Sequence, residues 1–304
     1  VIHDVKNGDV QKVPLPIYTI SHDGKTALSL NFSRLARTRP GYGYEGIADP
    51  WENDPAPQDD GIYAIDLVSG EFQLMISLAE VAKSQPRPDM KNAEHWLNHL
   101  LFRPDDQRFI FLHRWLATDG KRYTRLYTAN RDGSDIYMVS DDDLVSHFDW
   151  RDNDHILAWA RRKGEFSWLR PHHRHYRQWL KESRDDFYIL FKDKTACAHV
   201  IGKGILLSDG HCTYSPNGEW ILTDTYPDGE GMRTLILFHE KQQRRIDIGR
   251  FFSPPHVSSD VRCDLHPRWS PDGTKVCIDS THEGQRQMYV LDVTEIVNTS
   301  TLKS

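Results

Sequence analysis

Short runs of alternating apolar and polar residues recur along the chain, and tight-turn sequences separate them. Residues 14–20 and 27–32 form the first pair, joined by Ser-His-Asp-Gly at 21–24, and residues 61–67 and 70–74 form the second. Alternation with a period of two predicts β-strands, and turns rich in Asp, Asn, Pro and Gly predict hairpins. Two successive hairpins make one four-stranded antiparallel unit.

The same unit recurs four more times, with first strands that carry His99, His147, His211 and His266. Repeats of about 40–50 residues with four strands each are the signature of a β-propeller. We therefore expect an all-β fold, a β-propeller of four-stranded antiparallel blades in a single domain over residues 1–304. Five units and a half-unit at residues 1–10 are visible, and the fifth lacks an obvious fourth strand. A seven-bladed ring completed upstream of Val1 and a smaller complete ring both fit this count.

Composition narrows the function classes. The 304 residues carry a net charge of -6 and no long basic block, so a nucleic-acid role has no electrostatic support. No apolar run approaches the roughly 20 residues of a membrane span. The four cysteines lack CxxC spacing, so buried free thiols are the simplest interpretation.

Aligning the five units on their turns gives the most specific observation. Four residues before each turn the sequence has Ile17, His99, His147, His211 and His266. The first strand of a blade is its innermost, so these positions would form a ring. The histidines could be hydrogen-bonded structural residues, metal ligands, catalytic bases, or a combination of these. Cys263, three residues before His266, could add a thiolate, which would suit zinc.

Other chemistry is limited. There is no Gly-x-Ser-x-Gly elbow, no His-Glu-x-x-His helix and no Gly-rich phosphate loop after a strand. His172, His173 and His175 lie in a basic, aromatic insertion and are expected to decorate a loop. Histidine, tyrosine and arginine remain, with or without a metal. This combination suits abstraction of a proton next to a carboxylate, with the acid group neutralised by a cation.

Two segments carry a resemblance to a known group. They read Asp-Gly-His-Cys-Thr-Tyr-Ser-Pro-Asn-Gly (209–218) and Asp-Leu-His-Pro-Arg-Trp-Ser-Pro-Asp-Gly (264–273), the second followed by Asp-Ser-Thr-His-Glu-Gly (279–284). Over residues 95–293 the chain resembles the propeller polysaccharide lyases of the oligogalacturonate lyase and ulvan lyase type. These have seven blades and cleave uronate-containing glycans by β-elimination. Ser-Pro-Asp-Gly also occurs in non-enzymatic TolB-like propellers.

The resemblance implies a metal. Oligogalacturonate lyases hold it with histidines and a glutamine in a Gln-x-x-His-x-His pattern, and the matching positions here are Cys263, His266 and Arg268, with His211 from the preceding blade. Because the glutamine is missing, this part of the chain resembles ulvan lyases more closely, and in those enzymes a zinc is structural. We therefore expect a divalent metal, zinc first and manganese or calcium as alternatives. The predicted ligands are His147, His211, Cys263 and His266.

The resemblance also implies catalytic residues, because ulvan lyases use two histidines, a tyrosine and an arginine. By blade position these match His99, His113 and Tyr188; the arginine has no counterpart in the motifs, and we assign Arg233, with Arg37 as the alternative. Arginine and aromatic residues of the long loops are the expected sugar contacts: Arg37, Tyr42, Tyr44 and Trp168.

The expected function is a polysaccharide lyase that acts on an acidic polysaccharide or oligosaccharide, ulvan-like or pectic, and leaves a 4,5-unsaturated uronate. Such a substrate favours a secreted or periplasmic protein. Two other functions stay open: a propeller glycoside hydrolase on similar glycans, and a non-catalytic TolB-like interaction module. Neither a nucleic acid nor a membrane is an expected partner.

Overall fold

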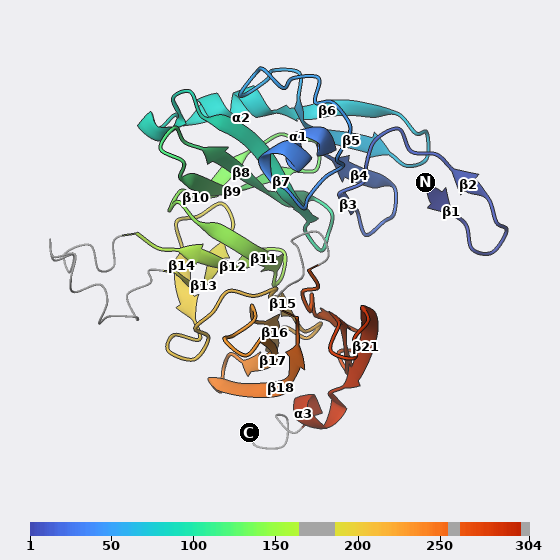
Figure 1. Cartoon of the computed structure of the whole chain (residues 1–304), viewed down its shortest axis with the longest axis vertical. Helices are drawn as coiled ribbons and strands as arrows, with labels where there is room; N and C mark the ends of the chain where they lie inside the picture. The colour runs from blue at the N-terminus through green and yellow to red at the C-terminus, as the bar shows by residue number, and fades with distance from the viewer. Residues whose placement is uncertain (164–185, 255–261, 299–304) are drawn as a thin grey trace, which may run out of the picture. The chain divides into compact units, whose positions relative to one another are not determined.

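A computed structural model describes residues 1–163, 186–254 and 262–298. The chain divides into two compact units, Val1–Asp143 (unit 1) and Leu144–Ser304 (unit 2), and each is described by itself. Nearly all regular structure is antiparallel β-sheet (Figure 1). Within the described residues no helix is both long and apolar enough to span a membrane.

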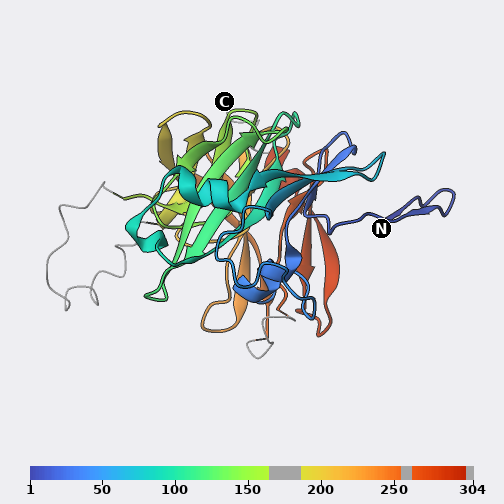
Figure 2. The ribbon, with the colours of Figure 1, turned by 90° about the horizontal axis from the view of Figure 1, so that it is seen from above.

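Unit 1 contains two four-stranded sheets and a terminal hairpin. The first sheet has the order β3-β4-β5-β6, and the second has the order β10-β9-β8-β7. The hairpin is the predicted half-unit, and its turn extends away from the other strands of unit 1 in both ribbon views (Figures 1 and 2). The strands of unit 1 are β1 (Ile2–His3), β2 (Val10–Gln11), β3 (Thr19–Ile20), β4 (Thr26–Ser29), β5 (Gly61–Asp66), β6 (Phe72–Ser77), β7 (Glu94–Phe102), β8 (Arg108–Leu116), β9 (Arg122–Asn130) and β10 (Tyr137–Ser140).

Unit 2 contains two four-stranded sheets and one three-stranded sheet, in the orders β11-β12-β13-β14, β15-β16-β17-β18 and β19-β20-β21. The last sheet lacks a fourth strand among the described residues, as expected. The strands of unit 2 are β11 (Val145–Trp150), β12 (His155–Arg161), β13 (Asp186–Lys192), β14 (Ala198–Ile201), β15 (Thr213–Tyr214), β16 (Trp220–Asp224), β17 (Met232–His239), β18 (Arg244–Phe252), β19 (Arg268–Trp269), β20 (Lys275–Ser280) and β21 (Gln287–Asp292). These sheets are blades, and the predicted β-propeller class is confirmed.

The repeated turns have the chemistry that the sequence predicts. In the Ser-Pro-Asn-Gly turn, the Gly218 amide donates to the Ser215 carbonyl over 2.8 Å, and the Ser215 hydroxyl donates to Asn217 Oδ1 over 2.6 Å. Gly218 has a φ of 70°, a left-handed conformation that favours glycine. Ser270 and Gly273 repeat the turn, with an amide-to-carbonyl distance of 2.9 Å. Each turn therefore sets the register of a hairpin.

Three short α-helices interrupt the sheets: α1 (Phe32–Thr38), α2 (Leu78–Ser84) and α3 (Thr294–Asn298); a 3-10 turn, η1, spans Pro88–Met90. The start of α1 differs from the predicted strand over 27–32. The strand β4 ends at Ser29, and the Asn31 side chain accepts hydrogen bonds from the amides of Ser33 and Arg34, which makes it a helix N-cap.

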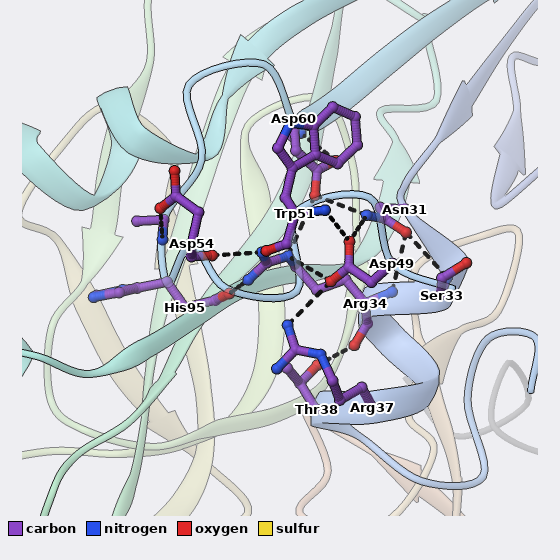
Figure 3. Close-up of polar contacts among 12 residues, drawn as sticks. Asn31, Ser33, Arg34, Arg37, Thr38, Asp49, Trp51, Asp54, Asp60 and His95 are labelled. Carbon is purple, nitrogen blue, oxygen red and sulfur yellow. Dashed lines mark hydrogen bonds and ion pairs between the residues drawn. The ribbon is translucent and has the colours of Figure 1, made fainter. Parts of the chain in front are cut away.

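The long loop after α1 is tied to unit 1 through one buried arginine (Figure 3). The Arg34 guanidinium donates to the carbonyl oxygens of Trp51 and Asp54 in the loop, over 2.8 and 2.7 Å. It also donates to Glu94 Oε1 over 2.7 Å and to the His95 carbonyl over 3.1 Å, both in β7. The loop that carries Tyr42 and Tyr44 is therefore fixed to the edge of the second sheet.

Candidate functional site

Three histidines of unit 2 lie side by side. His147 is in β11, His211 precedes β15, and His266 precedes β19. The ring centroids of His147 and His211 are 4.1 Å apart, and those of His211 and His266 are 3.9 Å apart. Equivalent positions of three successive sheets thus bring imidazoles together, as the sequence alignment of the turns predicts.

Carboxylates hold two of these imidazoles through the same nitrogen. His147 Nδ1 is 2.9 Å from Asp209 Oδ1, and His211 Nδ1 is 2.9 and 3.0 Å from the two oxygens of Asp224. Because Nδ1 is engaged in both rings, Nε2 is the nitrogen that can bind a cation or a proton. Burial acts to raise the pKa of Asp224, but the hydrogen bonds and charge of His211 outweigh it and lower that pKa below its usual value.

A carboxylate completes the cluster. Single donor atoms of His211, Asp264 and His266 all lie within 4.8 Å of one another. Two imidazoles and a carboxylate are a donor set that fits a divalent cation such as zinc or manganese. His266 has a φ of 41°, a left-handed conformation that is costly for a residue with a side chain and is often found at functional sites.

The predicted ligands and the observed cluster overlap in part. His211 and His266 are shared, and His147 lies against His211. Cys263 is buried with its Sγ 3.8 Å from the Asp264 carbonyl oxygen, and it is not part of the cluster. Asp264 was not predicted as a ligand. Its position two residues before His266, which repeats the position of Asp209 before His211, was the available signal.

Basic and aromatic groups adjoin the cluster. Arg262 donates to Asp264 Oδ2 over 2.6 Å, and its guanidinium carbon lies 5.5 Å from the Tyr226 ring centroid. The Tyr226 ring is in turn 6.2 Å from that of His147, and 39% of this tyrosine is exposed. An exposed ring and a guanidinium therefore stand beside the imidazoles. Neither residue was among the predicted site residues.

Two predicted catalytic residues of unit 2 lie deeper. Tyr188 is fully buried, with its hydroxyl 2.7 Å from Thr223 Oγ1 and 3.2 Å from the carbonyl of Gly210, next to His211. Burial raises its pKa well above the usual value. Arg233 is also buried, and its Nη2 lies 2.6 Å from Asp264 Oδ1 as an ion pair without hydrogen-bond alignment. Both residues pack behind the segments that present the cluster.

The two remaining predicted catalytic histidines belong to unit 1. His113 is fully buried, and its Nε2 lies 2.9 Å from His95 Nδ1. His99 Nδ1 lies 3.1 Å from the Tyr18 hydroxyl, and the His99 ring is 5.7 Å from that of Tyr42. These contacts place His99 with a group of tyrosines and His113 in the interior of the sheet.

Of the predicted sugar contacts, Arg37 pairs with Asp49 and Glu94 over 3.0 and 2.8 Å. The Tyr44 ring packs against Phe32, 5.0 Å between centroids, and half of this tyrosine is exposed. Trp168 lies outside the described residues, as do His172, His173 and His175. The roles assigned to all of these residues stay predictions.

No protein-family model matches the chain, and no curated protein matches it. Among solved structures it is similar to an oligogalacturonate lyase from Vibrio parahaemolyticus, with 16% identity and a TM-score of 0.58 over 91% of this chain and 65% of that one. It is also similar to TolB from Acinetobacter baumannii, with 12% identity and a TM-score of 0.46 over 78% of this chain and 47% of that one.

A second oligogalacturonate lyase, in complex with manganese, has 11% identity and a TM-score of 0.41, with 78% of this chain and 72% of that one covered. The chain thus spans less than two thirds of the Vibrio lyase and about half of TolB. At these identities the likeness shows the propeller fold.

Proposed function

We propose that the protein is a lyase that cleaves a uronic-acid-containing glycan by β-elimination. The observation that carries this proposal is the carboxylate-backed cluster of His147, His211 and His266 with Asp264. Arg262 and Tyr226 beside the cluster supply a group for a carboxylate and a surface for a sugar ring. The fold likeness to an oligogalacturonate lyase supports the architecture only.

The reaction requires a base for the C5 proton, a proton for O4 and a cation for the carboxylate. A base removes the proton from C5 of the uronic acid, the electron pair of that C–H bond forms the C4=C5 double bond, and the C4–O4 bond breaks with its electrons going to O4, which takes up a proton. Because the C5 proton is next to a carboxylate, a cation must neutralise that carboxylate for the proton to be removable.

In this proposal His211, Asp264 and His266 hold a divalent cation. The cation would withdraw charge from the uronate carboxylate. Asp224 keeps His211 in the tautomer that presents Nε2, and the Arg262 guanidinium orients Asp264 from the other side. A carboxylate in place of the predicted Cys263 thiolate removes the thiolate as a reason to prefer zinc, so we propose a divalent cation of the zinc or manganese kind.

We assign the base to His147. Its Nδ1 is held by Asp209, and that carboxylate stabilises the imidazolium formed when Nε2 takes a proton. Arg262 would bind the uronate carboxylate, and the exposed Tyr226 ring would pack against the sugar. The role predicted for His147 from the sequence, metal ligand, would use the same Nε2 atom.

The test is the product. Purified protein is incubated with polygalacturonate, ulvan and related glycans, with and without added zinc or manganese, and absorbance of the conjugated C4=C5 bond is followed together with product mass. Elimination gives absorbance and fragments without added water. Fragments that have gained water would establish a hydrolase instead, and no cleavage together with no bound metal would favour a TolB-like interaction module.

A variant pair separates the roles. We expect His147→Gln to retain the metal and lose most of the activity, because it removes the proposed base only. The matched control is His155→Gln, since His155 has the same Nδ1-to-carboxylate contact, 2.9 Å to Asp152, away from the cluster. Loss of metal in His147→Gln would make His147 a ligand.

A further inference from the structure

A second group of chemically distinctive residues lies in unit 1. It is centred on Tyr18, on Tyr42 in the loop after α1, and on His99 in β7. The Tyr18 hydroxyl is 3.1 Å from His99 Nδ1, and the Tyr42 ring is 5.7 Å from the His99 ring. The Arg39 guanidinium carbon lies 5.2 Å from the Tyr42 ring centroid. His99 has a φ of 54° at a β-bulge in β7, a left-handed conformation of the kind that clusters at ligand sites.

Two further arginines come from β8 and β9, in the same sheet as His99. Arg114 in β8 is opposite Trp96 in β7 and Thr124 in β9. Arg122 precedes Thr124 by two residues, so its side chain is on the same face as that of Arg114, as a diagonal neighbour. Asn98 follows Trp96 by two residues and shares this face. The sheet therefore gathers two guanidiniums and one amide on one face.

The charges of this group are unbalanced. Arg39 and Arg122 form no ion pair with an acidic residue in the described part of the chain, whereas Arg34, Arg37 and Arg87 each pair with at least two carboxylates. Burial, and then the positive charge of Arg39, lower the pKa of Arg114 to about 10. The same two causes lower the pKa of Arg122. Bringing cations together in this way is unfavourable unless an anion joins them.

Buried polar atoms without partners lie in the same region. Asn98 is 0% exposed, and neither its amide nitrogen nor its amide oxygen has a hydrogen-bond partner; Arg39 Nε is likewise buried and unpartnered. Such atoms are rare in folded proteins, because leaving them unsatisfied costs free energy. A polar ligand that reached them, or a water molecule that accompanied it, would satisfy them.

We propose that unit 1 has a binding site for an acidic sugar, with Arg39, Arg114 and Arg122 around its anionic group and Tyr42 against its ring. Guanidiniums suit a carboxylate or a sulfate ester, because their planar donors match two oxygens at once. Aromatic rings next to them suit the apolar face of a sugar. This inference rests on the proposed glycan substrate and specifies a site that holds a charged residue of it.

The experiment measures equilibrium binding of saturated galacturonate oligomers to the whole chain by calorimetry at low salt. We expect Arg39→Gln and Arg122→Gln each to weaken binding about tenfold, the loss typical of a charge-assisted hydrogen bond. The matched control is Lys121→Gln, which removes the same charge one residue from Arg122 at an exposed position. Fully methyl-esterified oligomers lack the carboxylate charge, so they should bind the wild type and the two variants with the same weak affinity.

The outcomes are decisive in both directions. Equal affinity in wild type, Arg39→Gln and Arg122→Gln, with unchanged thermal unfolding, would overturn the site even if the lyase reaction is confirmed. Arginine-dependent binding without unsaturated product would support the site and reject the lyase. A uronate-free sulfated galactan is the second arm: if it binds through these arginines and galacturonate oligomers do not, the site is for sulfate esters and the carboxylate assignment fails.

Discussion

The two groups of histidines in this protein differ in the hydrogen-bond partners of their imidazole rings. In unit 1, His95 and His113 contact each other at 2.9 Å in a buried stack next to Trp115. Burial, above all, lowers the pKa of both, and the charges of nearby arginines add to this. In unit 2, His147 and His211 contact carboxylates instead.

This difference decides what each group can do. A buried imidazole without a carboxylate stays neutral and acts as a packed polar side chain. An imidazole whose Nδ1 contacts Asp209 or Asp224 is held in one orientation and one tautomer, with Nε2 presented to a ligand. Residue type is therefore a poor guide to function on its own, because the partner of Nδ1 separates His147 and His211 from the buried pair.

The largest effect should come from removing a ligand. We expect His211→Ala to abolish binding of zinc or manganese, a loss greater than the roughly 10–100-fold typical of residues behind a ligand. Elemental analysis and competition with a chromophoric chelator measure it. The matching change in the other group, His95→Ala, should leave metal affinity as it is. Equal losses in both variants would break the comparison.

Removing the carboxylate behind the ligand should have a smaller effect. Asp224→Asn keeps the size of the side chain but weakens its hold on His211 Nδ1, so we expect metal affinity to fall about 10–100-fold. Asp152→Asn is the control, because Asp152 makes the same contact with His155 outside the cluster. An Asp224→Asn protein that binds metal like the wild type would show that tautomer control does not matter here.

Low pH should destabilise the folded protein through the buried pair, His95 and His113. The pKa of His95 is lowered from 6.5 to about 4, and that of His113 is also lowered, so below pH 6.5 the unfolded chain binds more protons than the folded one. Stability is therefore full above pH 6.5 and is lost as the pH falls toward 4. His95 alone accounts for about 3 kcal/mol of this loss.

Urea unfolding at several pH values tests this directly. Arginine side chains as a class do not titrate in this pH range, so they do not contribute to the slope. His95→Gln should unfold with a shallower dependence on pH than the wild type. An unchanged dependence in the variant would mean that His95 is protonated in the folded protein as readily as in the unfolded chain.

The smallest effect is expected at Cys263. Because its thiol lies outside the cluster, Cys263→Ser should bind metal within about twofold of the wild type. Asp264→Asn is the comparison, and it should lose affinity strongly because it alters a proposed ligand. A Cys263→Ser protein that loses its metal would restore the thiolate, and with it the case for zinc.

Much of the fold could be predicted from local signals. The Ser-Pro-Asx-Gly turns and the alternating runs gave the strand order of each sheet, since turn chemistry and side-chain period act within a few residues. The start of α1 was missed because Asn31 ends an apolar run that also fits a strand. The Asn31 side chain favours the helix over a longer strand, because it caps α1 and also contacts Asp49 and Asp60.

The candidate site was less predictable. Repeat alignment found His147, His211 and His266 because they occupy equivalent positions. Asp264 repeats the position of Asp209 in the preceding blade, a signal that was not used, whereas Arg262 belongs to one blade only and leaves no repeated signal. The burial of Tyr188 and His113 depends on neighbouring strands, which no single motif records. Sequence reasoning therefore located the cluster and missed the groups that surround it.

The Arg34 contacts also bear on how the chain assembles during synthesis. Two of the acceptors of Arg34, Glu94 and the carbonyl of His95, are 60 and 61 residues further along the chain. A growing chain therefore cannot complete this network until β7 has been made, because domains form their contacts only as the later residues emerge. Until then the segment with Arg39 and Tyr42 lacks its anchor to β7. The proposed acidic-sugar site can therefore form only after the strands β7, β8 and β9 have been made.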